Sequence, residues 1–377
     1  MPPTRREFLR QMTQWGALGG AARLLAGCGR GPAPEIPYQP TDQAARVAAV
    51  RGLDLRTMVS DALEALGGIA TLVHPGETVF LKPNFSGAGI ADYDIVAVGE
   101  ATKPEIVVAV AEACLEVGAA KVIIGEGAQV QQFDWERLAT LDGETNLAAE
   151  VARLNARFGD RVLLACLNRD SPDWDLVTSP YSGLNEIAVS SLVTRADRII
   201  SLPVLKTHRW TVMTAALKNF VGVASLARYT WGPPYRMDLH YCPGGIDTTF
   251  VDLVAALQPD LTLVDVSVCC EGNGPNVYPG WWGRTLDMRD RLGDWLLLAG
   301  TDLVAADATA ARVMGQDPAN IRQLTLARQL GLGQTDPDRI ALLGATLDEL
   351  QVEWQPASPA RDLIEGVDSA LAWLLHW

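Results

Sequence analysis

Short apolar runs that are typical of strands alternate with helix-like runs along most of this chain. The strand-like runs are Thr78–Leu81, Lys121–Gly125, Arg161–Leu167, Arg198–Leu205, Leu261–Val266, Trp295–Ala299 and Arg339–Leu343. The helix-like runs between them are Pro104–Val117, Thr145–Phe158, Trp210–Phe220, Phe250–Leu257 and Leu303–Met314. Strands that are separated by helices form βαβ units, whose crossovers place neighbouring strands in parallel. The sequence therefore predicts an α/β fold with a mostly parallel sheet and helices on both faces, in one lobe or two.

Two long segments interrupt this alternation. Residues 227–249 and 271–294 are rich in glycine, proline and aromatic residues. Loops of this length are more often functional than idle. In a parallel α/β sheet, ligands bind beyond the carboxyl ends of the strands. We therefore expect these aromatic-rich loops to border a binding site.

The first residues resemble an export signal, so we do not expect them to be part of the fold. Thr4–Arg10, with its Arg5-Arg6 pair, resembles a twin-arginine signal, and the glycine- and alanine-rich stretch 12–27 fits the apolar region that follows it. Leu25-Ala26-Gly27-Cys28 then resembles a lipobox, in which the Cys28 thiol receives the lipid. The alternative, an amphipathic helix with a chance arginine pair, must account for two motifs in the right order.

These motifs predict how the chain is divided into segments and where the protein is located. Residues 1–28 are the signal, residues 29–45 are a proline-rich tether and residues 46–377 are the α/β domain. The twin-arginine export machinery is then a partner, and the lipid on Cys28 holds the protein at the outer side of a cell-envelope membrane. Because this machinery carries folded proteins, the route is consistent with a cofactor inserted before export.

Charge excludes one class of partner. The chain has a formal charge of −14, and without residues 1–28 it has 27 basic and 44 acidic residues, a net charge of −17. Because a protein with this much negative charge repels phosphate backbones, we expect no nucleic acid partner. After the leader, no run reaches about 18 uncharged apolar residues, the length that a membrane-spanning helix needs.

Cysteines offer few candidates for chemistry once Cys28 is lipidated. Cys114 and Cys166 lie in apolar patterns, where a cysteine is buried as a small hydrophobic residue. Cys242 and the Cys269-Cys270 pair are the better candidates for one disulfide or for a metal contact. No Cys-x-x-Cys motif occurs, so the chain carries no iron–sulfur cluster motif of the ferredoxin type.

Lysine is rare, and three of the five lysines end predicted elements. Lys82 ends a strand just before Pro83-Asn84, Lys206 ends another before His208, and Lys218 precedes Asn219 on the helix predicted next. With helical spacing, a thin polar stripe would face a polar cavity, formed by Thr207, Thr211, Thr214 and Lys218. Lys206, His208 and Lys218 would then bind a carboxylate, a phosphate or another anion. The plain alternative is that each lysine faces water or caps carbonyls.

Acidic and metal-ligating residues complete the predicted site. Glu126 lies between two glycines at a strand end, and Glu271 precedes Gly272 and Gly274, which let the backbone approach a ligand closely. His208 is the expected general acid or base near neutral pH, with Glu126 or Glu271 orienting it or holding a metal. His208, His240 and Cys242 are candidate metal ligands, although no recognised ligand spacing supports a metal.

A series of motifs resembles one family over residues 78–315. The motifs, in order, are Leu81-Lys82-Pro83-Asn84, Thr102-Lys103-Pro104, Gly125-Glu126-Gly127, Pro203-Val204-Leu205-Lys206-Thr207-His208, Ala216-Leu217-Lys218-Asn219, Pro259-Asp260-Leu261 with Val264-Asp265, and Glu271-Gly272-Asn273-Gly274-Pro275. They are similar to those of the domain of unknown function 362 family. The resemblance implies site positions at Lys82, Glu126, Lys206, His208, Lys218, Asn219, Glu271 and Gly274, but no established reaction. Family members often carry a ferredoxin module, which this chain lacks, so the implied redox link would need a partner protein.

The sequence thus favours an exported, lipid-anchored enzyme of unknown reaction with one polar pocket. In this interpretation Lys206, His208, Glu126 and Glu271 are catalytic, while Lys82, Asn84, Lys218, Asn219, Gly272 and Gly274 hold a small anionic ligand or cofactor. Three alternatives stay open: a lipoprotein that captures a solute without chemistry, an accessory subunit of an exported redox complex, and a glycoside hydrolase with two carboxylates.

Overall fold

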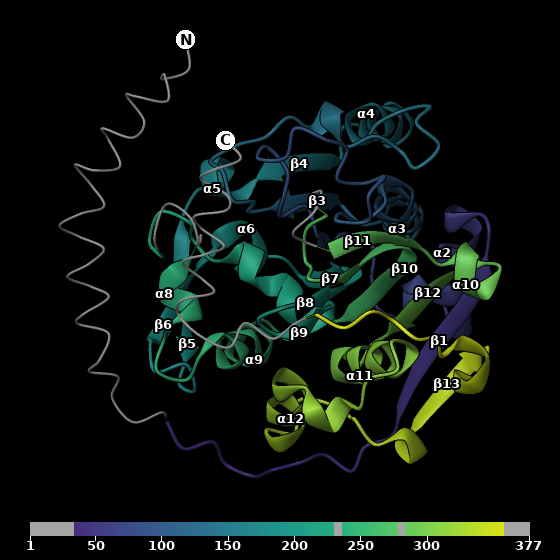
Figure 1. Cartoon of the computed structure of the whole chain (residues 1–377). Coiled ribbons are helices and arrows are strands. Elements are labelled where there is room, and N and C mark those ends of the chain that lie inside the picture. The colour runs from purple at the N-terminus through teal and green to yellow at the C-terminus, as the bar shows by residue number, and fades with distance from the viewer. Residues whose placement is uncertain (1–33, 230–235, 278–282, 358–377) are drawn as a thin grey trace, which may run out of the picture.

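A mixed β-sheet forms the centre of the molecule (Figure 1). The computed structural model describes residues 34–229, 236–277 and 283–357. Its strands are β1 (Ala45–Gly52), β2 (Thr78–Pro83), β3 (Lys121–Glu126), β4 (Val162–Cys166), β5 (Trp174–Ser179), β6 (Asn185–Ser190), β7 (Arg198–Leu202), β8 (Val204–His208), β9 (Val212–Thr214), β10 (Leu261–Gly272), β11 (Gly283–Asp287), β12 (Trp295–Gly300) and β13 (Ile340–Gly344). The main sheet runs in the order β13-β1-β12-β10-β7-β2-β3-β4.

The longer helices connect these strands. They are α2 (Leu55–Ala65), α3 (Pro104–Glu116), α4 (Leu147–Phe158), α9 (Ile246–Leu257), α11 (Leu303–Val313) and α12 (Arg322–Gln329). Short helical turns are α5 (Leu167–Asp170), α6 (Ser191–Thr194), α7 (Ala216–Asn219), α8 (Met237–His240), α10 (Arg289–Leu292) and α13 (Leu347–Leu350). Asp302 caps α11 by accepting a hydrogen bond from the Ala305 backbone N–H at 2.9 Å, a role that its position suggests from sequence alone.

Most of the sheet is parallel, as the alternating pattern predicts. β4, β3, β2, β7 and β10 pair in parallel, while β12 pairs antiparallel with both β10 and β1. The chain moves from β2 to β3 and β4 on one side, and from β7 to β10 on the other. The boundary between β2 and β7 is therefore a topological switch point, where ligands bind in open α/β sheets.

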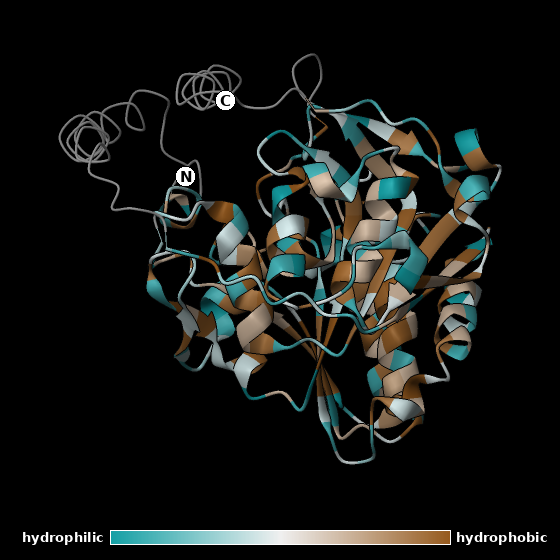
Figure 2. Ribbon diagram, turned by 90° about the horizontal axis from the view of Figure 1, so that it is seen from below, coloured by the Kyte–Doolittle hydropathy of each residue, from teal (hydrophilic) through white to brown (hydrophobic). Residues whose placement is uncertain are grey.

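The sheet separates two apolar clusters, which Figure 2 shows as hydrophobic strands between helices. Phe80 of β2 belongs to one cluster, with α9 and α11, while its neighbours Val79 and Leu81 belong to the other, with α2 and α3. Successive side chains of a strand point to opposite faces. This arrangement explains why the sequence of β2 is a continuous apolar run, because the strand is buried on both faces.

The predicted helix Trp210–Phe220 is wrong. Residues 212–214 form β9, which pairs antiparallel with β8, and only Ala216–Asn219 form the helical turn α7. Val212 has a positive φ of 64° at the turn between the two strands. The backbone groups of this segment are satisfied by pairing with β8, the strand directly before it in a hairpin, and helical spacing of the side chains does not reveal this pairing.

The predicted strand Arg198–Leu205 is divided at Pro203 into β7 and β8. Proline has no N–H to donate to a sheet, although its carbonyl accepts a hydrogen bond from the Asp265 N–H at 2.8 Å. β1, α2 and the β5–β6 hairpin lie outside the predicted elements.

Part of the predicted tether lies against the folded body. Ile36 packs on the apolar core, and the Gln39 N–H donates to the Gln329 carbonyl of α12 at 2.6 Å. β1 begins at Ala45, one residue before the predicted start of the domain. Residues 1–33, with the predicted signal and Cys28, lie outside the described residues.

Candidate functional site

The predicted site residues gather mainly at the switch point between β2 and β7. Lys82 pairs in register with Ser201 near the end of these two strands, and Asn84 follows β2 directly. Lys206 lies on β8, which continues from β7, and Asn219 lies on α7. The structure therefore brings together residues that are up to 137 positions apart in the chain.

Lys82 and Glu126 form a buried ion pair. Lys82 Nζ lies 2.9 Å from Glu126 Oε2, and the two side chains are 1% and 2% exposed. The same oxygen accepts a hydrogen bond from the Phe85 N–H at 2.7 Å, and burial lowers the pKa of Lys82 although Glu126 opposes this shift. The carboxylate of Glu126 thus holds Lys82 and the start of the next loop, and makes no hydrogen bond to His208.

Two amides connect Lys206 to this pair. Lys206 Nζ donates to Asn84 Oδ1 at 2.9 Å and to the Glu100 carbonyl at 2.7 Å. Asn84 Nδ2 donates to Asn219 Oδ1 at 3.2 Å, and Asn219 Nδ2 donates to the Lys82 carbonyl at 2.6 Å. Burial lowers the pKa of Lys206 to about 8. Lys82, Asn84, Lys206 and Asn219 form one buried network, which we call the switch-point network.

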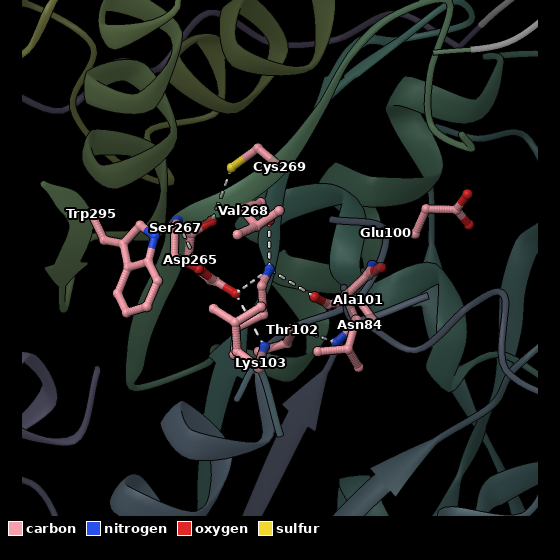
Figure 3. Close-up of polar contacts among 12 residues, drawn as sticks. Asn84, Glu100, Ala101, Thr102, Lys103, Asp265, Ser267, Val268, Cys269 and Trp295 are labelled. Carbon is pink, nitrogen blue, oxygen red and sulfur yellow. Dashed lines mark hydrogen bonds and ion pairs between the residues drawn. The ribbon is translucent and has the colours of Figure 1, made fainter. Parts of the chain in front are cut away.

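A second buried ion pair lies beside this network (Figure 3). Lys103 Nζ is 3.1 Å from Asp265 Oδ2, and both side chains are 0% exposed. The same ammonium donates to the carbonyls of Ala101 and Val268 at 3.1 and 2.5 Å. Asp265 also accepts from Ser267, so every polar atom of the pair is engaged. This pair ties the start of α3 to the middle of β10.

Lys218 differs from these three lysines. Its side chain is half-buried, and its Nζ lies 5.3 Å from the centre of the Phe250 ring. Within residues 34–229, 236–277 and 283–357, its ammonium has no hydrogen-bond acceptor and no ion pair. Burial, and then the charge of Lys206, lower the pKa of Lys218 to about 8. Lys218 is thus a cation beside the switch-point network whose ammonium can still donate hydrogen bonds to a ligand.

The positive charge of Lys218 acts on two histidines. Burial lowers the pKa of His208 well below 6.5 and that of His240 to about 4, and the charge of Lys218 is the largest electrostatic contribution in both. His208 Nδ1 accepts a hydrogen bond from the Trp210 N–H at 3.1 Å, so the proton of the neutral ring is on Nε2. The Trp210 ring packs edge-on against His240 and Tyr241, with centroids 5.5 and 5.7 Å apart. We call Lys218, His208, His240 and Trp210 the cationic cluster.

A buried carboxylate positions the turn that carries Lys218. Asp307 on α11 accepts hydrogen bonds from the Ala216 and Leu217 N–H groups at 2.7 and 3.0 Å. Burial raises the pKa of Asp307 to about 7. Since α7 has only four residues, this cap from a distant helix fixes where the turn begins.

Glu271 does not join the cluster. Its Oε1 accepts from Arg284 and Arg291 at 2.8 and 2.7 Å, and its Oε2 accepts from the Gln355 N–H at 2.8 Å. All of these partners stabilise the end of β10 and the segment that follows α13. The prediction that Glu271 orients His208 therefore has no contact to support it.

The predicted glycines have a packing role. A Cβ atom on Gly274 would lie 2.2 Å from the Thr207 carbonyl oxygen, and Gly272 has a φ of +78°. Thr207 Oγ1 donates to the Gly272 carbonyl at 2.7 Å. Glycine is required here because this loop packs directly on the backbone of β8, next to His208.

The cysteines form no disulfide within the described part of the chain. Cys114, Cys166, Cys242, Cys269 and Cys270 are all free and buried. The thiol of Cys242 donates to the Gly245 carbonyl at 3.3 Å, and His240 contacts the Arg236 carbonyl, so these two candidate ligands have separate partners. No three His, Cys, Asp or Glu side chains among the described residues are grouped so that they could hold a metal ion.

Sequence reasoning missed two residues of the site. Arg236 is 4% exposed, and it donates to the carbonyls of Ala224 and Gly127 at 3.0 and 2.7 Å. Burial lowers its pKa to about 10, and the charge of Glu126 opposes this shift. Asp265, the partner of Lys103, is the other. Both Asp265 and Lys103 belong to the motif series of the family, but neither was predicted as a site residue. The signal for both was weak, because nothing in the sequence distinguishes a buried arginine or aspartate from an exposed one.

Most of the residues of this site lie in a region that matches a known family. A model of the family described as "Domain of unknown function (DUF362)" matches residues 79–312. The chain belongs to this family, as its motif series predicts.

Comparison with individual proteins gives one curated relative and weak structural likenesses. A thylakoid-associated protein of Synechocystis is 29% identical over 284 residues, which cover 74% of this chain and 75% of the relative. The lactate racemase apoprotein from Thermoanaerobacterium thermosaccharolyticum has a TM-score of 0.36 at 14% identity, over 62% of this chain and 56% of that chain. A Thermotoga maritima protein has a TM-score of 0.41 at 12% identity, over 71% and 61%. The chain spans less than two thirds of either solved protein, and likenesses this weak support no argument.

In the part of the chain that the structure describes, every helix is too short or too polar to cross a bilayer.

Proposed function

We propose that the chain binds a small anionic ligand or cofactor at the cationic cluster and that it acts on this ligand as an enzyme. The observation that carries the proposal is the ammonium of Lys218, which lies over the Phe250 ring and has no hydrogen-bond acceptor or ion pair among the described residues. The other buried lysines, Lys82, Lys103 and Lys206, are satisfied by carboxylates, amides or carbonyls. Desolvating a cation without a partner is costly, so a site that retains one is built for an anion from outside the chain.

The neutral histidines refine this assignment. A ring with a pKa well below 6.5 is a poor proton donor in the free protein, so His208 serves first as a neutral hydrogen-bond donor through Nε2. An anion beside Lys218 would raise the pKa of both histidines, because opposite charges favour the protonated form. His208 therefore becomes an acid or base only when the ligand is bound.

Lys218→Met tests the anion site. Methionine keeps a long apolar side chain but removes the charge, so we expect anion affinity to fall by about 1.5–3 kcal/mol, about 10- to 150-fold in Kd. Phosphate, sulfate, acetate and oxalate serve as probes in calorimetry. Binding to the unmodified protein should also weaken as the pH rises through about 8, because Lys218 then loses its charge.

Lys121→Met is the matched control. Lys121 is exposed at the start of β3, so the same substitution there should leave anion affinity unchanged. The thermal midpoint of Lys218→Met should stay constant or rise, because an unpaired half-buried charge is removed. Equal affinity in Lys218→Met and the parent protein for every probe would contradict the proposed site.

The location of the protein is a second part of the proposal. The twin-arginine motif and the lipobox support an exported protein that is anchored by a lipid on Cys28, and the thylakoid-associated relative supports association with a membrane.

Cys28→Ser should release the protein from membranes without unfolding it. The lipid is added to this thiol alone, and residues 29–44 separate it from the first strand. Fractionation of cells that express the variant, followed by immunoblotting, measures the release. Arg5→Lys with Arg6→Lys is the companion variant, which should instead leave the precursor in the cytoplasm. Membrane attachment that persists in Cys28→Ser would contradict the lipid anchor.

Capture of a solute without chemistry is the second candidate function. The packing of Trp210 on His240 and Tyr241 favours it, since aromatic rings at the edge of a site suit many binding proteins. An accessory role in an exported redox complex is compatible with the same geometry. Metal analysis and an absorbance spectrum of protein recovered from its native envelope distinguish these roles. A bound chromophore or a stoichiometric metal favours the enzyme, and a colourless protein that releases a small solute favours capture.

A further inference from the structure

The lysine side chains of this chain differ sharply in the freedom of their amines. Lys82, Lys103 and Lys206 each donate two or three hydrogen bonds to fixed oxygens. Lys121 is exposed to water at the start of β3. Lys218 alone among the described lysines is half-buried and has no acceptor for its amine.

The groups around Lys218 suit nucleophilic chemistry. Lys206 adds a second positive charge that disfavours the ammonium form, and a desolvated lysine next to another cation is the usual arrangement of an amine nucleophile. The charge of Lys218 also lowers the pKa of His208 and of His240, so both rings are neutral. Asp247, the acidic group whose charge favours the ammonium of Lys218, is already paired with Arg322 at 3.5 Å.

We infer that Lys218 is a nucleophile that forms an imine with a small aldehyde acid or 2-oxo acid. This inference rests on the proposed function, because the carboxylate of such a ligand is attracted by the ammonium of Lys218 before the step and by the protonated C=N nitrogen after it. It gives that site a ligand class, a carbonyl carried on a carboxylate, and a covalent step.

The step balances without an oxidant or a reductant. The lone pair of Lys218 Nζ attacks the carbonyl carbon, and the C=O π electrons move to oxygen. The nitrogen then passes one of its protons to this oxygen, which gives a neutral carbinolamine. A further proton, supplied by the solvent, goes to the hydroxyl, and water leaves as the C=N bond forms with the positive charge on nitrogen. In this step His208, whose ring proton is on Nε2, would donate a hydrogen bond to the developing oxyanion, and His240, whose Nδ1 contacts the Arg236 carbonyl, would relay the proton from nitrogen to oxygen through Nε2.

Reductive trapping with glyoxylate tests this step. Cyanoborohydride reduces the imine and leaves carboxymethyl-lysine, which peptide mapping assigns among only five lysines. At pH 7 a pKa of about 8 leaves about a tenth of Lys218 as the neutral amine, far more than an ordinary lysine with a pKa of about 10.4 has, and part of this gain is offset by weaker nucleophilicity. We expect one adduct at Lys218, labelled at least about tenfold more than Lys121, and suppression of this adduct by oxalate.

Lys218→Arg separates covalent chemistry from binding. Arginine keeps the charge, so oxalate binding should persist, while the adduct at position 218 is lost. Lys121→Arg is the matched control, in which labelling of Lys218 should not change. His208→Asn should slow trapping without removing oxalate binding.

The outcomes distinguish the two proposals. Oxalate binding without an adduct at Lys218 overturns the imine and leaves the anion site intact. Absence of both overturns both. Labelling that follows exposure, with Lys121 modified as much as Lys218, also overturns the inference.

Discussion

Lys103→Met is expected to lower the free energy of unfolding by about 3–5 kcal/mol, the range for breaking a buried ion pair by removing one partner. The substitution leaves the Asp265 carboxylate in a site with no exposure and takes the donor from the carbonyls of Ala101 and Val268. Asp265 keeps its bonds from Ser267, which only partly offset the loss. Urea denaturation measures the change.

Two further variants make this result specific. Lys121→Met changes an exposed lysine in the same way and should alter stability by no more than about 0.5 kcal/mol. Lys103→Met combined with Asp265→Asn removes the stranded charge and should recover part of the loss. A cost of less than about 1 kcal/mol in Lys103→Met would show that water or a rearranged partner reaches Asp265.

Glu126→Gln is expected to cost a similar amount, about 3–5 kcal/mol, because it removes the carboxylate that pairs with Lys82 and whose charge favours the protonated form of Arg236. Glutamine has nearly the same shape and can still accept from the Phe85 N–H, so the loss reports the charge. Adding Lys82→Met to this variant should restore most of the stability, because a buried pair replaced by apolar groups is nearly neutral.

The cost of Glu126→Gln should also depend on pH. Burial already lowers the pKa of Lys82, and without Glu126 it falls further below its value in the unfolded chain. The unfolded state then binds more protons than the folded state, so the stability of the variant rises as the pH climbs from neutral toward the unfolded pKa. Denaturation at pH 7 and at pH 9 should show a smaller gap from the parent protein at the higher value. A gap that widens with pH would contradict a charged Lys82.

Local patterns were sufficient to predict the strands and helices of the main sheet. β2, α3, β3, α4, α11 and β12 lie within a few residues of their predicted ranges, because each combines an apolar run with a clear turn signal. The family could also be predicted from the sequence, because its motifs are short runs of neighbouring residues at the ends of these elements.

The predicted site was partly assembled by the same logic. Lys82, Asn84, Lys206 and Asn219 are in contact because the carboxyl ends of parallel strands meet at one edge. Glu271 was assigned to the site on the same grounds, but its carboxylate is held by Arg284 and Arg291. A position at a strand end does not determine to which face the side chain points.

What the sequence determined by itself is the α/β alternation, the family and the set of polar residues at strand ends, because these depend on neighbours in the chain. Only the tertiary structure decided how each charge is compensated. Lys82, Lys103 and Lys218 look alike in the sequence, yet two are paired with Glu126 and Asp265 and one has no acceptor among the described residues. The difference arises because the partner of a buried charge comes from a distant element, and its presence or absence sets whether that charge stabilises the fold or remains available to a ligand.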